Sequence, residues 1–251
     1  GGVAGRARGG AGGGATGGAS GAAGTAAGGA AGSALPPVFV SYPCDQTAGP
    51  ALNDASGNGR GGALEGTASF DAGVIGNALV LDGAAGTYVR LPAGLLATLR
   101  DTTIAFWVRP RAKASAANAW QRVFDFGADT TSYMFFTSYS DDNKLAHFGI
   151  TVTGNKNEQG LNATAPLPGG TWTHVAIVLG PAGGALYMNG VVAQTNAALK
   201  LRPADLGMTV NDWLGRSQFT GDPNFDGEID QLLIYAAALT PEQVAALFQQ
   251  R

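Results

Sequence analysis

An acidic stretch near the end of the chain, TGDPNFDGEIDQLLIY (residues 220–235), has residue types and spacing that could bind a metal ion or cleave a glycosidic bond. Counted from Asp222, its side chains follow the start of a helix-loop-helix Ca²⁺ loop, which takes oxygen ligands at alternate positions and a bidentate glutamate at position 12. That position is Leu233, which has no oxygen to offer. The flanking residues favour strands instead of helices. A Ca²⁺-sensor loop is therefore not expected.

The same stretch carries two carboxylates that a strand would present on one face. Glu228 and Asp230 are two residues apart, and a retaining glycosidase needs two carboxylates about 5–5.5 Å apart. The jelly-roll endoglucanases place theirs in an E-x-D-x-E strand, but the third position here is Leu232. Three other glutamates are expected in loops or in a helix: Glu65, Glu158 and Glu242. We predict no catalytic residue, with a catalytic jelly-roll glycoside hydrolase kept as the alternative.

Histidine and cysteine give no sign of a nucleophilic site. His147 and His174 are the only histidines, each lies inside a strand pattern, and neither is beside a G-x-S-x-G elbow. We expect His174 to make structural hydrogen bonds. Cys44 is the only cysteine, so the chain has no internal disulfide, and it is expected to be a small buried apolar residue.

The composition of the whole chain argues against a nucleic-acid partner and against a membrane-spanning helix. Of the 251 residues, 45% are hydrophobic and 13% are charged, and the formal net charge is −3. A net negative charge argues against nucleic acid as a main partner. No apolar run reaches the ~18 residues of a membrane-spanning helix, so no transmembrane segment is expected.

The start of the chain differs in composition from the rest. Residues 1–34 are almost entirely Gly and Ala, and such a segment cannot bury a core. We predict a disordered Gly/Ala-rich linker over residues 1–37 and one domain over residues 38–251. The sequence begins without Met or an apolar signal core, so we expect a mature or trimmed product whose export signal, such as a lipoprotein signal, lies upstream.

The domain reads as a series of short strands rich in Val, Ile, Phe, Tyr and Trp, separated by Gly, Asn, Asp and Pro. In TIAFWVRP, Ile104, Phe106 and Val108 alternate with their neighbours, which indicates a strand with one buried face. Asn189-Gly190 between two such segments predicts a tight hairpin. Many strands with little helix predict an all-β, two-sheet antiparallel jelly-roll sandwich.

One short helix is expected at the C-terminal end of the chain. Thr240 is a good N-cap, Pro241 suits the first helical position, and Gln243 can return a capping-box hydrogen bond. Val244, Leu247 and Phe248 would then form an apolar stripe that docks on the sandwich.

An ordered set of segments, over roughly residues 38–251, resembles the laminin-G-like (LamG) jelly-roll domains of the concanavalin A-like lectin/glucanase superfamily. The set includes SYPCDQTAGPALNDASGNGR, GNALVLDG, TIAFWVRP, WTHVAIVL, LYMNGVV and FDGEIDQLLIYAAALTPEQV. The resemblance implies an extracellular module, common in secreted bacterial proteins, that binds glycans or protein partners without catalysis. The chain departs from the family pattern at Cys44, usually aromatic or aliphatic, and at Gln46, where an acidic residue is common.

The resemblance also implies a structural calcium ion, because jelly rolls of this fold often tie the N-terminal loop to a C-terminal strand in this way. Asp54 in NDASGNG and Asp230 in GEID are the best candidate ligands, with Asp45 behind them. The alternatives are that Asp54 closes a turn and that Asp230 hydrogen-bonds to a loop. The Gln46 substitution weakens any carboxylate site at the first strand.

Aromatic residues in loops are the candidates for ligand binding, because sugar rings stack their apolar faces on Trp and Tyr. Trp120 follows a run of small polar residues, and Tyr139 stands close to Asp141. Trp213 and Arg216 lie in NDWLGRSQF, just before the acidic stretch. Core packing is the alternative for Trp213.

These observations together predict a non-catalytic binding module for a glycan or an extracellular protein, secreted or anchored at a cell surface. The remaining alternatives are the jelly-roll glycoside hydrolase and a structural or adhesive spacer without a small ligand.

Overall fold

The computed structural model describes residues 1–2 and 34–250. Most of the predicted linker, residues 1–37, therefore lies outside the described residues. Within the described part of that segment, Leu35 already packs against buried residues of the domain. All strands and helices belong to the unit that spans Gly32–Arg251.

The first sheet, sheet A, is built around β16 (Asp226–Tyr235), which contains the acidic stretch. One edge of β16 pairs with β7, while its other edge pairs with β5 near its start and with β1 near its end. In spatial order the strands of sheet A are β14 (Val191–Asn196), β13 (Gly183–Met188), β12 (Thr173–Gly180), β7 (Thr102–Pro110), β16, β5 (Asn77–Asp82) and β4 (Ser69–Ala72), with β1 (Val38–Tyr42) alongside β16.

The second sheet, sheet B, also has eight strands and is antiparallel throughout. In spatial order they are β11 (Gln159–Asn162), β10 (His147–Thr151), β9 (Tyr133–Thr137), β8 (Arg122–Gly127), β15 (Asn211–Leu214), β6 (Tyr88–Arg90), β3 (Gly62–Glu65) and β2 (Ala51–Leu52). Short 3-10 helices occupy three connections: Ala116–Asn118, Asn155–Asn157 and Pro203–Leu206.

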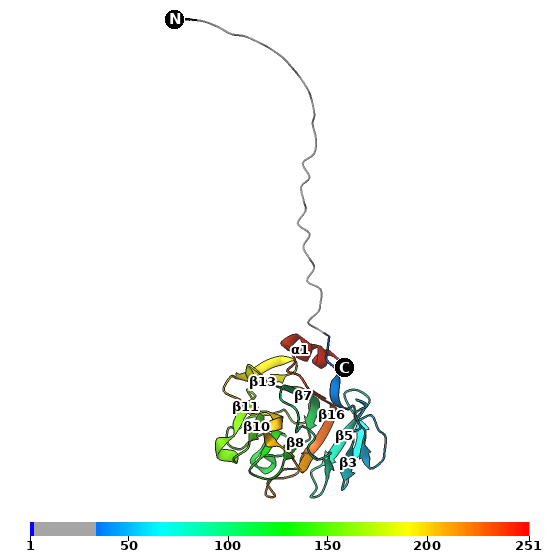
Figure 1. Cartoon of the computed structure of the whole chain (residues 1–251). Coiled ribbons are helices and arrows are strands. Elements are labelled where there is room, and N and C mark those ends of the chain that lie inside the picture. Colours follow the sequence, from blue (N-terminus) through cyan, green and yellow to red (C-terminus); the bar gives the residue numbers. More distant parts are fainter. Residues whose placement is uncertain (3–33, 251) are drawn as a thin grey trace. The chain divides into compact units, whose positions relative to one another are not determined.

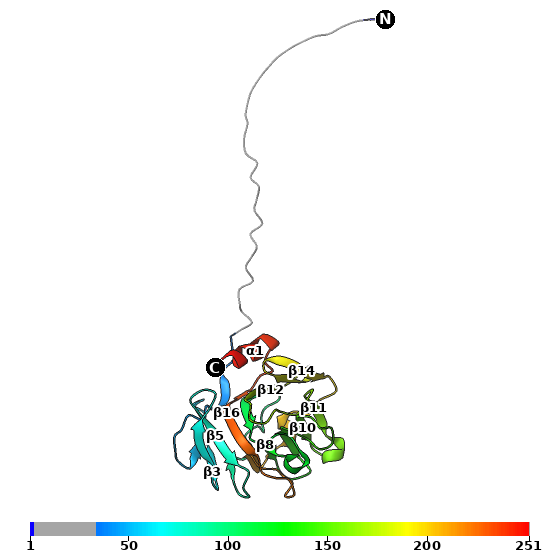
Figure 2. The same ribbon diagram turned by 180° about the vertical axis from the view of Figure 1, so that it is seen from behind.

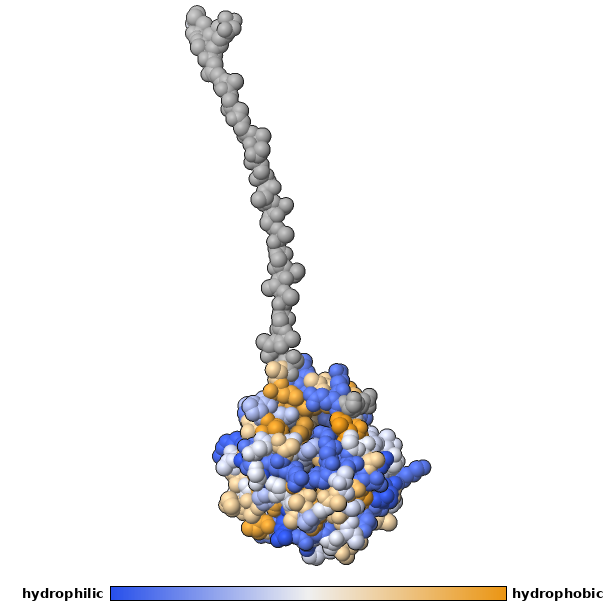
Figure 3. All heavy atoms as spheres, turned by 90° about the vertical axis from the view of Figure 1, so that its right-hand side faces the viewer, coloured by the Kyte–Doolittle hydropathy of each residue, from blue (hydrophilic) through white to orange (hydrophobic). Residues whose placement is uncertain are grey.

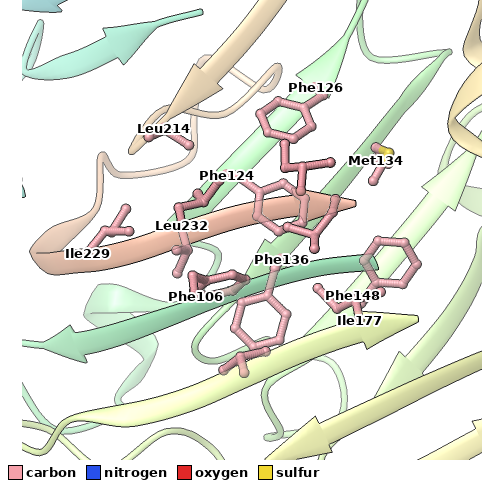
Figure 4. Packing of buried hydrophobic residues seen from close by; sticks show 14 of the residues in the cluster. Phe106, Phe124, Phe126, Met134, Phe136, Phe148, Ile177, Leu214, Ile229 and Leu232 are labelled. Atoms are coloured by element: carbon pink, nitrogen blue, oxygen red, sulfur yellow. The ribbon is translucent and has the colours of Figure 1, made fainter. Parts of the chain in front are cut away.

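The main core lies between the two sheets, and aromatic rings from both meet there (Figure 4). Phe106 of sheet A makes edge-to-face contacts with Phe124 and Phe136 of sheet B, at ring-centroid distances of 5.9 and 5.6 Å. Such aromatic pairs add to the stabilisation from buried area. Cys44 is buried in the same core, as expected. The predicted two-sheet jelly-roll sandwich is thus confirmed.

A smaller apolar cluster covers the other face of sheet A. Helix α1 (Pro241–Gln249) supplies Val244 and Leu247 to this cluster, and it lies beside β13 and β14 in the two ribbon views (Figures 1 and 2). The predicted cap is present: Gln243 N–H donates to Thr240 Oγ1 at 3.3 Å, and Thr240 N–H donates to Gln243 Oε1 at 2.9 Å. This cover explains why β7 is buried on both faces and not on one alone.

The predicted hairpin joins β13 to β14, with φ of +51° at Asn189 and +78° at Gly190. The surface mixes hydrophilic and hydrophobic residues on the face shown in Figure 3. Of the described helices, none combines the length and apolar character needed to cross a membrane.

Candidate functional site

The outward face of sheet B carries an aromatic and charged group of side chains at its centre. Along β9, Met134 and Phe136 belong to the core, so Tyr133 and Phe135, which alternate with them, face outward. The strands β8, β10 and β11 of this sheet lie together on one side of the sandwich in both ribbon views (Figures 1 and 2). The two rings therefore form a platform on the outward face of the sheet, and other side chains cover it, since each of the two residues is only 1% exposed.

The Arg122 guanidinium lies on this platform. Its central carbon is 3.6 Å from the Phe135 ring centroid and 5.1 Å from that of Trp120. Its Nη2 atom is 3.2 Å from an Asp222 carboxylate oxygen, and its Nε atom is 3.6 Å from one of Asp125. Only 4% of Arg122 is exposed, and its Nη1 atom has no hydrogen-bond partner. Stacking and ion pairing together hold the guanidinium flat on the ring.

Burial changes the acid–base properties of this group. It lowers the pKa of Arg122, and the Asp125 and Asp222 carboxylates counteract the change. Burial also raises the pKa of Asp125 to about 7, which Arg122 and the backbone N–H of Gln218 oppose.

Glu158 reaches the same face from the loop between β10 and β11. The Tyr133 hydroxyl donates to its Oε2 atom at 3.2 Å, and His147 Nε2 lies 2.7 Å from its Oε1 atom. Gly149 of β10 makes room for it, because a Cβ there would collide with the Glu158 carboxyl group and the Phe135 ring. The local sequence HFGIT therefore combines two core residues with a gap on the outward side.

These side chains enclose a cavity of about 320 Å³. This volume is at the small end of the ~300–1,000 Å³ range of ligand pockets. Its aromatic walls are Trp120, Tyr133, Phe135 and Phe219, and the other lining residues are Arg122, Asp142, Asn155, Glu158 and Asp222.

The backbone of Trp120 is held in an uncommon conformation. Its φ is +64°, in the left-handed region that non-glycine residues seldom adopt, and its N–H donates to the Tyr139 carbonyl at 2.9 Å. Such conformations often occur at functional sites.

The predicted ligand-binding residues separate into three places. Trp120 lines the cavity. Tyr139 is only 8% exposed, its hydroxyl donates to Asp141, and Asp141 pairs with Lys144, so neither residue lines the cavity. Their neighbour Asp142 does.

Trp213 belongs to β15 of the same sheet, and Arg216 lies in the loop that follows this strand. The Arg216 guanidinium carbon is 4.5 Å from the Trp213 ring and 4.7 Å from the Tyr88 ring. Arg216 lines a second cavity of about 350 Å³, and Phe219 and Asp222 line both cavities.

The sequence reasoning missed most of the first cavity: Arg122, Tyr133, Phe135, Asp142, Asn155, Glu158, Phe219 and Asp222. Strand alternation in YMFF separates Tyr133 and Phe135 from Met134 and Phe136, but all four residues are apolar or aromatic, so the sequence does not show which pair faces the core. The loop residues had no signal either, since they meet only in the folded domain.

Two of the three predicted calcium ligands converge on one turn. An Asp230 oxygen accepts the N–H groups of Val74 and Ile75, at 2.8 and 3.0 Å, and an Asp45 oxygen accepts that of Asn77 at 3.1 Å. The other Asp230 oxygen, Oδ1, is buried without a partner. Burial raises the pKa of Asp230 to about 6, and the nearby Asp45 charge adds to this.

Asp54 does not join them. Its two carboxylate oxygens accept the N–H groups of Ser41, Ser56 and Arg60, so it closes a turn, as the alternative interpretation has it. Over the described residues, no group of three or more His, Cys, Asp or Glu side chains is placed to hold a metal ion.

Comparison with known proteins identifies the family. Residues 82–245, more than half of the chain, match the laminin-G-type family model of the concanavalin A-like lectin/glucanases superfamily. The chain therefore belongs to this superfamily, as the sequence resemblance predicted. No curated protein matches the sequence.

Among solved structures, the chain is similar to domain 4 of AbnA, a GH43 extracellular arabinanase from Geobacillus stearothermophilus, in complex with arabinotriose. That match has a TM-score of 0.70 and 26% identity, and covers 84% of this chain and 98% of that domain. The botulinum neurotoxin serotype D/C binding domain (TM-score 0.63, 17% identity) and that of Paraclostridial Mosquitocidal Protein 1 (0.60, 15%) share the fold. The matches cover 84% of this chain and 51% of each of those chains.

Proposed function

We propose that this domain is a non-catalytic carbohydrate-binding module that holds neutral sugar units in the cavity on sheet B. The observation that carries the proposal is the cavity itself, whose four aromatic walls surround the Arg122, Glu158 and Asp222 side chains. Aromatic faces stack on the apolar faces of sugar rings, and carboxylates accept hydrogen bonds from sugar hydroxyls.

The charge of the cavity favours a neutral sugar in it. Three carboxylates line it, from Asp142, Glu158 and Asp222, against the single guanidinium of Arg122. That guanidinium is already close to the Asp125 and Asp222 carboxylates. An acidic sugar unit would meet an excess of negative charge here.

The binding of arabinotriose by the similar domain 4 supports an arabinose oligosaccharide as the first ligand to test. The extracellular arabinanase that contains that domain also supports the proposal that this domain acts outside the cytoplasm, secreted or at a cell surface.

The carboxylates of Glu158 and Asp222 already contact other protein groups, which supports binding without catalysis. Both oxygens of Glu158 contact protein groups, from His147 and Tyr133. Asp222 Oδ2 accepts from the Ser217 hydroxyl at 2.7 Å and lies beside Arg122. The acidic strand offers no replacement, because Glu228 pairs with Arg109 at 2.9 Å and Leu232 lies in the core. Retaining hydrolysis needs two carboxylates free to act on the glycosidic bond.

Calorimetric titration with arabinotriose tests this proposal, with Trp120→Ala as the test variant. Trp172→Ala is the matched control, because Trp172 stacks with Arg109 of sheet A and lies outside the cavity. We expect wild type and Trp172→Ala to bind equally and Trp120→Ala to bind at least about 10-fold more weakly, the scale of one lost stacking contact. Equal binding by all three proteins, or release of shorter sugars, would contradict it.

We also propose that Asp45 and Asp230 hold a structural Ca²⁺ ion against the Gly73–Asn77 turn. The unpartnered Asp230 Oδ1 supports this, because Ca²⁺ takes carboxylate and carbonyl oxygens. The residues Cys44 and Gln231, next to these aspartates in sequence, have left-handed φ values of +61° and +47°. Asp54 is left out because backbone N–H groups occupy both of its carboxylate oxygens, whereas Asp230 Oδ1 has no partner.

Thermal melting tests the calcium proposal. Ca²⁺ should raise the melting temperature of the wild type and EDTA should reverse the rise, because an ion that binds only the folded state stabilises it. Asp230→Asn should remove the response, while Asp54→Asn, although less stable, should keep it. A wild-type melting temperature unaffected by either reagent would rule the ion out.

A further inference from the structure

A second cavity, lined by the β5–β6 and β15–β16 loops, is next to the proposed sugar site. It has a volume of about 350 Å³, and the shared residues Phe219 and Asp222 separate it from the first cavity. Gly83, Ala85 and Gly86 form part of its lining, so little side-chain volume fills it there. A chain of sugar units that occupies the first cavity could therefore continue past Phe219 into the second.

The charged group in this second cavity is Arg216, which is partly buried. Its guanidinium is held against the rings of Tyr88 and Trp213. Of the eight arginines within residues 34–250, Arg216 alone has neither an ion pair nor a hydrogen bond at its guanidinium. Its hydrogen-bond donors are therefore open to an anionic group of a ligand, while the two rings hold the guanidinium in place.

The acidic side chains around this cavity are already engaged. Asp222 Oδ2 accepts from Ser217 and pairs with Arg122 at 3.2 Å. Asp82, which precedes the Gly83–Gly86 lining, directs its two oxygens to the Thr67 hydroxyl and the Ala84 N–H. Asp222, the only carboxylate in this lining, is thus already paired with Arg122, and Arg216 is the charged lining residue without an ion pair.

We propose that the second cavity is a subsite for a carboxylate-bearing sugar unit, a uronic acid, in the same glycan whose neutral units occupy the first cavity. The inference rests on the proposed carbohydrate-binding function. Guanidinium groups bind carboxylates through two parallel N–H···O bonds, and stacking on two rings leaves the edge of the Arg216 guanidinium available for them. The two cavities would then select a glycan that carries both neutral and acidic units.

Affinity electrophoresis of the full chain through polysaccharide gels tests this proposal. The probes are glucuronoarabinoxylan, an arabinose-rich pectic polysaccharide, and each of these after chemical reduction of its carboxyl groups to alcohols. Linear arabinan serves as a purely neutral probe. We expect at least one native polymer to bind about 10-fold more tightly than its carboxyl-reduced form, and high salt to diminish the difference.

Variants separate the second subsite from the first. Arg216→Gln should abolish the preference for the native polymer and leave binding of the reduced polymer unchanged, and Arg216→Lys should keep part of the preference. The melting temperature of each variant checks that it is folded. If a structural change accompanies Arg216→Gln, the wild-type comparison of native and reduced polymers still decides the matter.

The outcomes distinguish the two proposals. Equal wild-type binding of native and reduced polymers, with weaker binding by Trp120→Ala, would overturn the acidic subsite and leave the neutral site standing. Absence of binding to every probe would overturn both. A preference for the native polymer that persists in Arg216→Gln would show that Arg216 is not its cause, and would also overturn the proposal.

Discussion

The central guanidinium carbon of Arg122 lies 3.6 Å from the ring centroid of Phe135, on the outward face of sheet B. The two residues are on adjacent strands, β8 and β9. Their contact joins the aromatic platform to the Asp125 and Asp222 carboxylates, so the same side chains support the fold and line the proposed sugar site.

Replacement of Arg122 by Met should lower the free energy of unfolding strongly. Asp125 is completely buried, and the loss of Arg122 would leave its carboxylate without a nearby positive charge. Breaking a buried pair from one side costs about 3–5 kcal/mol. Urea denaturation at neutral pH measures the change.

The double variant Arg122→Met/Asp125→Leu should recover much of that loss, because it removes the buried charge together with its partner. Arg100→Met is the control, since the Arg100 side chain is 72% exposed, so the loss of its ion pair with Asp205 should have little effect. A small loss in the single Arg122 variant would mean that Asp125 does not need this partner.

Replacement of Gly149 by Ala should weaken sugar binding. The added Cβ would collide with Glu158 and Phe135, and either group must move out of the cavity wall to relieve the contact. We expect at least about a 10-fold loss of affinity for arabinotriose, the loss that corresponds to 1.4 kcal/mol, measured by calorimetry.

Gly221→Ala is the matched control, because a Cβ at this loop position meets no atom within 4 Å and should leave the affinity unchanged. Unchanged affinity in Gly149→Ala would show that the position of Glu158 does not matter for binding.

His174 should make the domain less stable in acid. Burial lowers its pKa from 6.5 to about 4, so the unfolded chain binds the proton more readily than the folded domain. The contribution of the neutral His174 ring to stability is therefore fully present above pH 6.5 and is lost as the pH falls toward 4. The ring packs against Trp107 and Phe248, and its Nδ1 atom is buried without a partner, so the structural hydrogen bonds expected of His174 are absent at that atom.

His174→Phe keeps an aromatic ring at this place and removes the titration. When the pH is lowered from 7.5 to 4.5, the wild type should lose about 2–3 kcal/mol more unfolding free energy than the variant does. Chemical denaturation at the two pH values measures it. A difference independent of pH would contradict the account of His174.

Local sequence signals predicted the parts of the fold that depend on a few neighbouring residues. Asn189-Gly190 determines its own turn, and Thr240 and Gln243 form their cap within a single helical turn. The period-two pattern of β7 correctly assigned Phe106 to the core. It could not show that α1 covers the opposite face, because that contact joins segments far apart in the sequence.

The candidate site was harder to predict from the sequence, because its residues also come from segments far apart in the chain. Trp120 was predicted from its place in a loop, because sugar rings stack on aromatic side chains, and it does line the cavity. Arg122 and Phe135 become neighbours only through the pairing of β8 with β9, and Glu158 reaches them across Gly149. The strand YMFFT is buried along its whole length, so its composition alone does not reveal which side is a binding surface.

A crystal structure of the domain with arabinotriose bound tests the central claim most directly. The account predicts electron density for at least one intact sugar ring in the cavity on sheet B, stacked on Trp120 and hydrogen-bonded to Glu158 or Asp222. An ordered sugar on another surface with this cavity empty, or a cleaved sugar within it, would contradict the account.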